Sequence, residues 1–145
     1  MNYTIRPIGP EDAEGAAALR RMPGVFKNTL GLPSYRTADS EAFIAGLDDG
    51  TVIGCAGLTV CSNPRMRHVG AVGLFVHADY QGRGVGTTLM ETLLDLADHW
   101  LMLVRVELEV FADNERAIRL YEKLGFEQEG LLRMTTVRNG RYVDE

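Results

Sequence analysis

Two short stretches of the chain, residues 3–8 and 104–111, alternate apolar and polar side chains. This alternation predicts β-strands, because successive side chains of a strand point to opposite faces of a sheet. Residues 51–60 and 68–76 are also rich in strand-forming residues. Residues 42–47 could form a short helix, but the Asp48-Asp49-Gly50 that comes next is typical of a hairpin turn. We therefore predict another strand at 42–47.

Three segments carry helix signals instead. Pro10, Glu11 and Asp12 supply start-of-helix chemistry for an Ala-rich segment that runs to about Arg21. Residues 85–102 repeat apolar side chains on one helical face. The members of this face are Leu89, Met90, Leu93, Leu94, Ala97 and Leu101. A shorter helix is predicted from Asp113 and Asn114, which suit a cap, to Leu124, with Gly125 as its stop.

The order of these elements predicts an α+β domain, a central sheet flanked by helices, rather than a doubly wound nucleotide-binding fold. Residues 25–41 are irregular, because Gly31 and Pro33 would interrupt a long helix, and such polar, aromatic segments often line a pocket. Residues 126–137 lead into a hairpin at Asn139-Gly140, a pair that suits a type I′ turn.

Composition limits the class of protein. At 145 residues and 46% hydrophobic content, the chain fits a single domain, residues 1–145. A net charge of −5 disfavours a nucleic-acid partner, which clustered Lys and Arg would bind. The sequence shows neither a signal peptide pattern nor an apolar run long enough for a bilayer, so we expect a cytoplasmic protein without a membrane partner. Cys55, Cys61 and three scattered histidines match no metal motif, and we expect no metal.

A glycine-rich loop at residues 81–86 comes after a predicted strand and opens a predicted helix. Glycines allow close backbone approach, and the helix N-terminus presents N–H groups to an anion, so the loop suits phosphate binding. A tight strand-to-helix turn would use the same residues. A Walker loop would need Gly-Lys-Ser/Thr, but Gly86 is followed by Thr87-Thr88. A dinucleotide-binding fingerprint would need a glycine at the position of Thr87. The binding motifs for ATP and for NAD therefore each lack a key residue in this sequence.

The spaced Gln81, Gly84 and Gly86, followed by A-x-x-L-Y-x-x-L-G-F at residues 117–126, resemble the GNAT superfamily of acyl-CoA-dependent N-acetyltransferases. The resemblance covers residues 52–137 and implies a mixed, mostly antiparallel sheet of about six to seven strands. Four further segments look like a bacterial subgroup of L-amino acid N-acyltransferases. These are NTLGLP (28–33), DHWL (98–101), VFADNERAI (110–118) and RNGRYVD (138–144).

The resemblance implies residues for acetyl-CoA, which would be the cosubstrate. The backbone of one segment would hold the pyrophosphate: Gln81, Gly82, Arg83, Gly84, Val85 and Gly86. The backbone of Leu74, Phe75 and Val76 would pair with the pantetheine arm like an added strand. Asn114 matches a position that contacts the arm near the thioester, although a plain helix cap explains this residue equally well.

The resemblance also implies catalytic residues. Tyr121 would donate a proton to the departing thiolate, with core packing as the alternative role. Glu109, on the same predicted strand face as Glu107, would be the base, with a solvated carboxylate as the alternative. The backbone N–H of Val76 would polarise the thioester carbonyl. An α-amine of pKa about 8 suits a weak base, because a lysine would cost roughly 3 kcal/mol more to deprotonate.

The sequence indicates the acceptor amine less clearly than the cosubstrate. Phe26, Asn28 and Tyr35 are candidate substrate-binding residues, and Arg65 or Arg67 could clamp a carboxylate. The main hypothesis is acetyl transfer to the primary amine of a small molecule, with a free amino acid as one candidate. Alternatives are a protein N-terminal or lysine acetyltransferase, a non-catalytic acyl-CoA-binding module, and a generic nucleotide-binding module. A homodimer is left open.

Overall fold

A central sheet forms the body of the molecule in the computed structural model, which describes residues 2–22 and 41–145. Its strand order is β1-β2-β3-β4-β5, antiparallel from β1 to β4, with β5 parallel to β4. The strands are β1 (Tyr3–Pro7), β2 (Glu41–Leu47), β3 (Val52–Val60), β4 (Val69–Val76) and β5 (Arg105–Glu107). The predicted strands at 3–8, 42–47, 51–60 and 68–76 are confirmed. The irregular segment predicted at 25–41 lies almost wholly outside the described residues.

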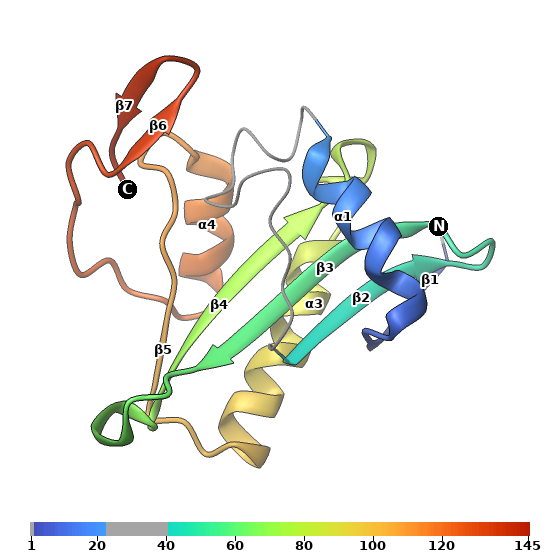
Figure 1. Cartoon of the computed structure of the whole chain (residues 1–145), viewed down its shortest axis with the longest axis horizontal. Helices are drawn as coiled ribbons and strands as arrows, with labels where there is room; N and C mark the ends of the chain where they lie inside the picture. Colours follow the sequence, from blue (N-terminus) through green and yellow to red (C-terminus); the bar gives the residue numbers. More distant parts are fainter. Residues whose placement is uncertain (1, 23–40) are drawn as a thin grey trace.

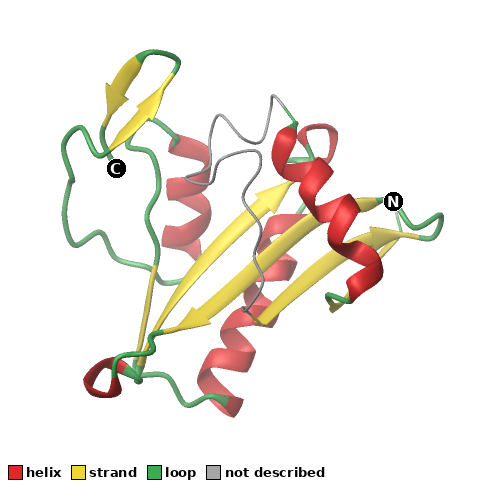
Figure 2. Cartoon of the chain, viewed as in Figure 1, coloured by secondary structure: helices red, strands yellow, loops and turns green. Residues whose placement is uncertain are grey.

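Helices cover both faces of this sheet (Figures 1 and 2). On one face lies α1 (Ala13–Arg21), which continues from the 3₁₀ turn η1 (Pro10–Asp12). On the other lies α3 (Val85–Asp95), which continues into a π-helical turn, Leu96–Trp100. The predicted helix at 85–102 is thus confirmed, with a widened last turn. α4 (Glu115–Lys123) is capped by Asn114 and followed by Gly125, as predicted.

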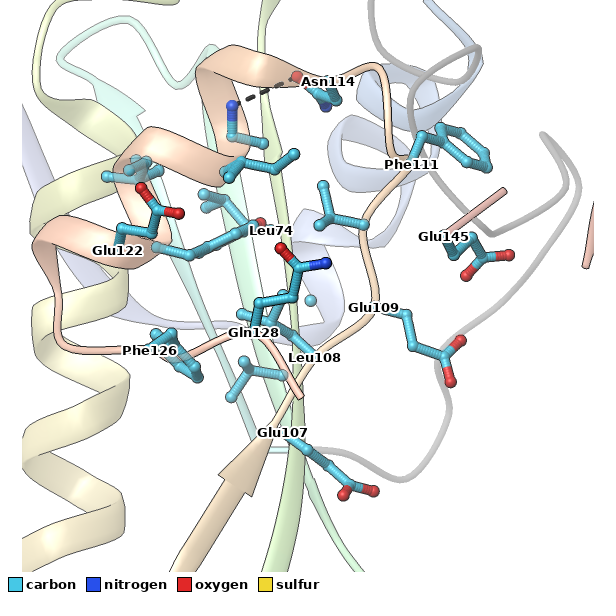
Figure 3. Close-up of a pocket in the computed structure, with 18 of the residues that line it drawn as sticks. Leu74, Glu107, Leu108, Glu109, Phe111, Asn114, Glu122, Phe126, Gln128 and Glu145 are labelled. Atoms are coloured by element: carbon cyan, nitrogen blue, oxygen red, sulfur yellow. Dashed lines mark hydrogen bonds between the residues drawn. The ribbon is translucent and has the colours of Figure 1, made fainter. Parts of the chain in front are cut away.

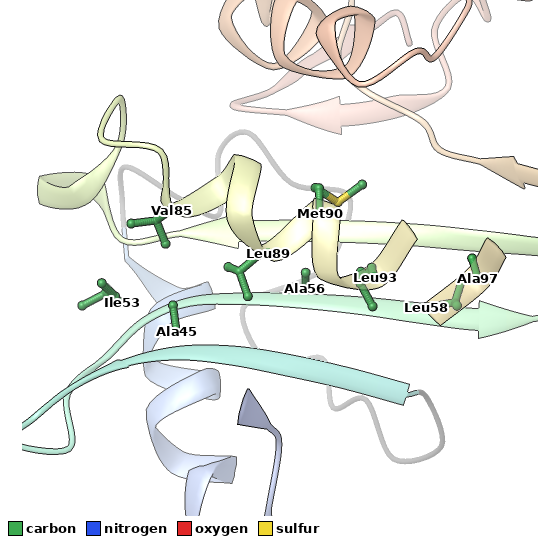
Figure 4. Close-up of a cluster of buried hydrophobic side chains, with 9 residues drawn as sticks. All are labelled: Ala45, Ile53, Ala56, Leu58, Val85, Leu89, Met90, Leu93 and Ala97. Atoms are coloured by element: carbon green, nitrogen blue, oxygen red, sulfur yellow. The ribbon is translucent and has the colours of Figure 1, made fainter. Parts of the chain in front are cut away.

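The main core lies between α3 and the sheet, as Figure 4 shows. The predicted apolar face supplies Leu89, Met90 and Leu93 of α3 and Ala97 of the π-helical turn, each 0% exposed. They pack on Ala45, Ile53, Ala56 and Leu58 of β2 and β3. Leu101, predicted on the same face, comes after the helix has ended and is 38% exposed. A Cβ placed on Gly54 would lie 2.7 Å from Leu89 Cδ1. The missing side chain at Gly54 therefore allows the start of α3 to lie close against β3.

The strand predicted at residues 104–111 is shorter than expected. Only Arg105–Glu107 is strand, paired with β4 from Val69↔Arg105 to Ala71↔Glu107. β4 continues to Val76, whereas residues 108–111 leave it (Figure 1). Alternation from Glu107 to Val110 is still present in the burial of the side chains. The alternating pattern therefore predicted an extended segment correctly. Residues 108–111 are not a strand, because the β4 backbone no longer lies beside them.

The last two strands form a separate small sheet. β6 (Thr136–Arg138) and β7 (Arg141–Val143) pair antiparallel around Asn139 and Gly140, whose φ angles are 51° and 74°. Positive φ at both positions is what a type I′ turn requires, so the predicted hairpin is confirmed. The predicted α+β class, with a mixed and mostly antiparallel sheet, is confirmed too. Seven strands are present in the described part of the chain, divided five and two.

Candidate active site

A pocket of about 1370 Å³ opens where β4 and the residues after β5 separate. One wall is the second half of β4, and the opposite wall is residues 105–112. α4, residues 126–132 and Glu145 complete the lining (Figure 3). The early end of the β4–β5 pairing is therefore what creates the pocket.

The glycine-rich loop lies at one end of this pocket. Gly82 and Gly84 have φ angles of 74° and 87°, a region that favours glycine, and a Cβ on either would meet nothing within 4 Å. Gly84 is the N-cap of α3, so the first N–H groups of the helix have no partner within it. The loop is thus open to an approaching ligand and presents donors that suit an anion.

The other loop residues have distinct positions. The Gln81 amide donates to the Val76 carbonyl at 3.1 Å and accepts from Arg116 at 3.3 Å, which fixes the loop to β4 and α4. Arg83 lies over the Tyr80 ring, 5.3 Å from its centroid, and does not line the pocket. Val85 is 0% exposed, so only its backbone could face a ligand.

The end of β4 offers an unpaired edge. Leu74, Phe75 and Val76 line the pocket and pair on their other side with β3. The His77 N–H donates to Ile53 of β3, and successive peptide groups of a strand point in opposite directions. The N–H groups of Leu74 and Val76 therefore point away from β3, towards the edge that β5 has left. Two of the three predicted residues can pair with an added strand, whereas the backbone of Phe75 faces β3.

α4 presents a line of pocket residues at helical spacing. Its cap, Asn114, accepts a hydrogen bond from the Ala117 N–H at 3.3 Å and also lines the pocket. Both roles considered for Asn114 are thus compatible with its position. Arg116 and Leu120, one turn apart, line the pocket as well. Arg116 was not among the predicted site residues, although its spacing from Leu120 indicated the same face.

Tyr121 extends from α4 into the pocket wall. Its ring packs edge to face against Phe126, with centroids 5.9 Å apart, and burial raises the pKa of its hydroxyl to about 12. A group of this pKa stays protonated at neutral pH. Complete proton transfer to a thiolate of pKa about 8.5 would be uphill by roughly 5 kcal/mol. The Tyr121 hydroxyl is therefore suited to donating a hydrogen bond to a developing thiolate.

Glu109 lies on the wall opposite β4. Figure 3 shows Glu107 and Glu109 extending to the same side of their segment, as the alternation predicted. Glu107 accepts from Arg105 at 3.0 Å. The pKa of Glu109 is raised, first by burial, then by the hydrogen bond that its protonated form can make with Glu145 and by the negative charges of Glu145 and Glu107. A carboxylate with a raised pKa is a better proton acceptor than an exposed one.

Two other candidate residues, Arg65 and Arg67, are not brought to this pocket. Arg65 lies in the 3₁₀ turn η2 (Pro64–Met66) and Arg67 comes directly after it, before β4 begins, and both are exposed and outside the pocket lining. Phe26, Asn28 and Tyr35 lie outside the described residues.

In residues 2–22 and 41–145, no group of three His, Cys, Asp or Glu side chains could hold a metal ion. No helix of this part of the chain is long and apolar enough to cross a bilayer.

The pocket combines an open strand edge, a glycine-rich loop and a partly buried tyrosine, an arrangement that suits an acyltransferase. Residues 14–126 match the acetyltransferase (GNAT) family, and the chain belongs to this family. The family resemblance and the predicted enzyme class are therefore confirmed: the protein is an N-acetyltransferase of the GNAT family.

Two curated relatives are similar over most of the chain. The L-amino acid N-acetyltransferase AaaT of Escherichia coli (strain K12) is 36% identical over 149 residues, 97% of this chain and 92% of the relative. The N-alpha-acetyltransferase RimI of Mycobacterium tuberculosis (strain ATCC 25618 / H37Rv) is 34% identical over 141 residues, 90% of this chain and 82% of the relative.

Solved structures share the fold at lower identity. A putative phosphinothricin N-acetyltransferase superposes with a TM-score of 0.83 at 21% identity, covering 99% of this chain and 94% of that one. The putative acetyltransferase yncA of Salmonella typhimurium, solved with acetyl-CoA, superposes with a TM-score of 0.80 at 22% identity. The superposition covers 99% of this chain and 90% of that one.

Proposed function

We propose that this protein transfers an acetyl group from acetyl-CoA to the primary amine of a small molecule, with free amino acids as the first candidates. The observation that carries the proposal is the pocket itself. It joins an unpaired strand edge, a loop that suits phosphates and a partly buried phenol. The similarity to AaaT supports a free amino acid as acceptor.

The residues present fit acetyl-CoA. The open side of Gly82 and Gly84 and the start of α3 would receive the pyrophosphate. The outward N–H groups of Leu74 and Val76 would pair with the pantetheine arm. Gly86 supports this arrangement, because a Cβ there would lie 3.2 Å from Leu74 and 3.4 Å from Val76. A small residue at Gly86 thus allows α3 to begin directly against the strand that would bind the arm.

In this proposal Glu109 takes a proton from the acceptor ammonium, directly or through water. The freed lone pair of the nitrogen attacks the thioester carbonyl carbon, whose oxygen the Val76 N–H stabilises. Breaking the carbon–sulfur bond releases the thiolate, which accepts a hydrogen bond from Tyr121. The thiolate takes up the second proton that the nitrogen loses, so the products are the amide and the free thiol of CoA. An α-amine suits this arrangement better than lysine, because less free energy is needed to deprotonate it.

A protein N-terminus is a second candidate acceptor, favoured by the similarity to RimI. Like a free amino acid, it offers an α-amine, so the proposed chemistry would be the same. The two candidates differ beyond the amine, because a free amino acid carries a carboxylate there and a protein N-terminus continues as a polypeptide. A non-catalytic acyl-CoA-binding module remains the alternative of another class.

The proposal is tested by measuring free-thiol release from acetyl-CoA with a panel of amino acids, amines and short peptides. We expect release with at least one free amino acid. Release only with peptides would identify the protein N-terminus as acceptor and reject the small-molecule proposal. No release with any amine, despite thermal stabilisation by CoA, would support the binding module.

A further inference from the structure

Glu145 lines the pocket, and its carboxyl group lies beside Glu109 (Figure 3). Its Oε1 accepts hydrogen bonds from the hydroxyls of Thr135, at 2.8 Å, and Thr136. The backbone of Glu145 pairs with Leu132 in both directions, at 2.7 and 2.9 Å. The side chain is therefore held firmly in one position.

The second oxygen of this carboxyl is enclosed but unpaired. Glu145 Oε2 is buried and has no hydrogen-bond partner among the described residues. Buried polar oxygens normally have a donor, so this atom needs an explanation. A protonated Glu109 would supply one, because a carboxylic acid donates one hydrogen bond and a carboxylate donates none.

We propose that Glu145 is a positioning residue for Glu109, with which it shares the proton taken from the acceptor amine. This inference rests on the proposed function, in which Glu109 is the base. When the acceptor ammonium loses its proton, Glu109 becomes a carboxylic acid and its O–H donates to Oε2 of Glu145. The nitrogen lone pair then forms the carbon–nitrogen bond, and the thiolate leaves.

The surrounding charges favour this pairing. Glu145 and Glu107 are the described charged groups that act on Glu109. Arg105 is engaged by Glu107 and by Glu129 of the facing loop, and Arg138 of the hairpin by Asp113. Asp144, next to Glu145, accepts the Met134 N–H at 2.8 Å. From α4, Tyr121 lines the same pocket as a neutral phenol. Arg105 and Arg138 are thus already paired with other carboxylates. The shared proton is then what relieves the repulsion between Glu109 and Glu145.

The substitution Glu145→Gln tests this arrangement. Gln keeps Oε1 for the two threonines and replaces Oε2 by an NH₂ donor, so it should stabilise the charged form of Glu109. We expect the acid limb of the kcat/KM profile to move to lower pH by about one unit. Glu91→Gln, on the exposed side of α3 outside the pocket, removes one negative charge elsewhere and should leave the limb unmoved.

A readout independent of turnover is the carbon-13 NMR titration of the Glu109 carboxyl in the free protein. The resonance should titrate at lower pH in Glu145→Gln than in wild type. If Glu145→Gln fails to fold, Thr135→Val is the second variant. It removes one hydrogen-bond donor to Glu145, so the Glu145 carboxyl should be less firmly positioned and the titration of Glu109 should change. Unchanged titration of Glu109 in the variants would overturn the inference. Absence of acetylation with every amine would instead count against the proposed function, and the titration would still be readable.

Discussion

At the scale of single residues, burial rather than residue type separates the functional side chains from ordinary ones. Tyr121 and Tyr142 are chemically identical, but Tyr121 is partly buried in the pocket wall and Tyr142 is 70% exposed on the hairpin. Burial raises the pKa of the Tyr121 hydroxyl to about 12. In the proposed function, this hydroxyl is the hydrogen-bond donor to the leaving sulfur.

Tyr121→Phe should lower kcat by about 10²-fold, because the ring stays packed against Phe126 while the hydroxyl donor is lost. Steady-state kinetics with the best acceptor measures the change, and the melting temperature checks that folding is intact. Tyr142→Phe is the matched control. Wild-type turnover in Tyr121→Phe would remove the hydroxyl from the leaving-group step.

Asp12 is a residue whose surroundings bear on stability rather than on activity. It is 5% exposed, accepts two hydrogen bonds of 2.7 Å from Arg6, and its pKa is lowered mainly by these bonds. A lowered folded-state pKa contributes stability above the unfolded-state value of about 3.8, and this contribution is lost as the pH falls through the folded-state pKa.

Asp12→Asn should therefore reduce the free energy of unfolding by about 1 kcal/mol at neutral pH, because the partly exposed Arg6 loses its charged partner. The difference from wild type should be constant above about pH 5 and shrink at lower pH. Urea unfolding at several pH values measures it. A difference that grows on acidification would contradict this account.

At the scale of elements, the site depends on how closely α3 approaches the sheet. Gly54 of β3 and Gly86 of α3 lie where a Cβ would crowd side chains across the contact. This contact fixes the start of α3, and with it the loop at residues 81–86, relative to the open edge of β4. The helix and strand were each predictable, but the closeness of their contact was not.

Gly54→Ala should destabilise the protein by about 1–3 kcal/mol, because the new methyl would lie 2.7 Å from Leu89 Cδ1 and 3.1 Å from Val85 Cγ1. The measurement is chemical denaturation. Gly73→Ala in β4 is the matched control, since a Cβ there meets nothing within 4 Å. Equal stability of the two variants would show that the packing can relax without cost.

At the scale of the whole molecule, the pocket joins parts of the chain that are far apart in sequence: β4, the segment after β5, α4 and the C-terminal residues. Backbone hydrogen bonds from Ala112 to Asp144 and between Leu132 and Glu145 close this side of the structure. A ligand that spans the pocket should therefore stabilise the fold as a whole.

Acetyl-CoA at about 100 times its Kd should raise the free energy of unfolding by about 2.7 kcal/mol, whereas ATP and NAD should have little effect. Gly84→Val should weaken the stabilisation, because a β-branched residue is strained at a φ of 87°. Gly140→Val, with a φ of 74° in the distant hairpin turn, is the control for strain alone. Thermal shift at several CoA concentrations measures the stabilisation in both variants. An equal loss of binding in Gly84→Val and Gly140→Val would contradict the role of the loop.

The sequence by itself determined the elements, because apolar periodicity, caps and turn residues are local signals. The apolar face of α3, the Asn114 cap and the Asn139-Gly140 hairpin all lie where these signals predicted. It also determined the family, through the spacing of Gln81, Gly84 and Gly86 and the motif around Tyr121. Within each of these two motifs the residues are close together in sequence, so the arrangement of each motif depends mainly on local geometry.

Only the tertiary structure decided where strand pairing stops and which distant side chains meet. The sequence pattern continued the fifth strand to residue 111, but β5 loses its partner after Glu107, and the pocket opens there. Nor could any pattern bring Glu145 to Glu109, 36 positions earlier in the chain. Such contacts depend on how the elements pack against one another, which local periodicity does not encode.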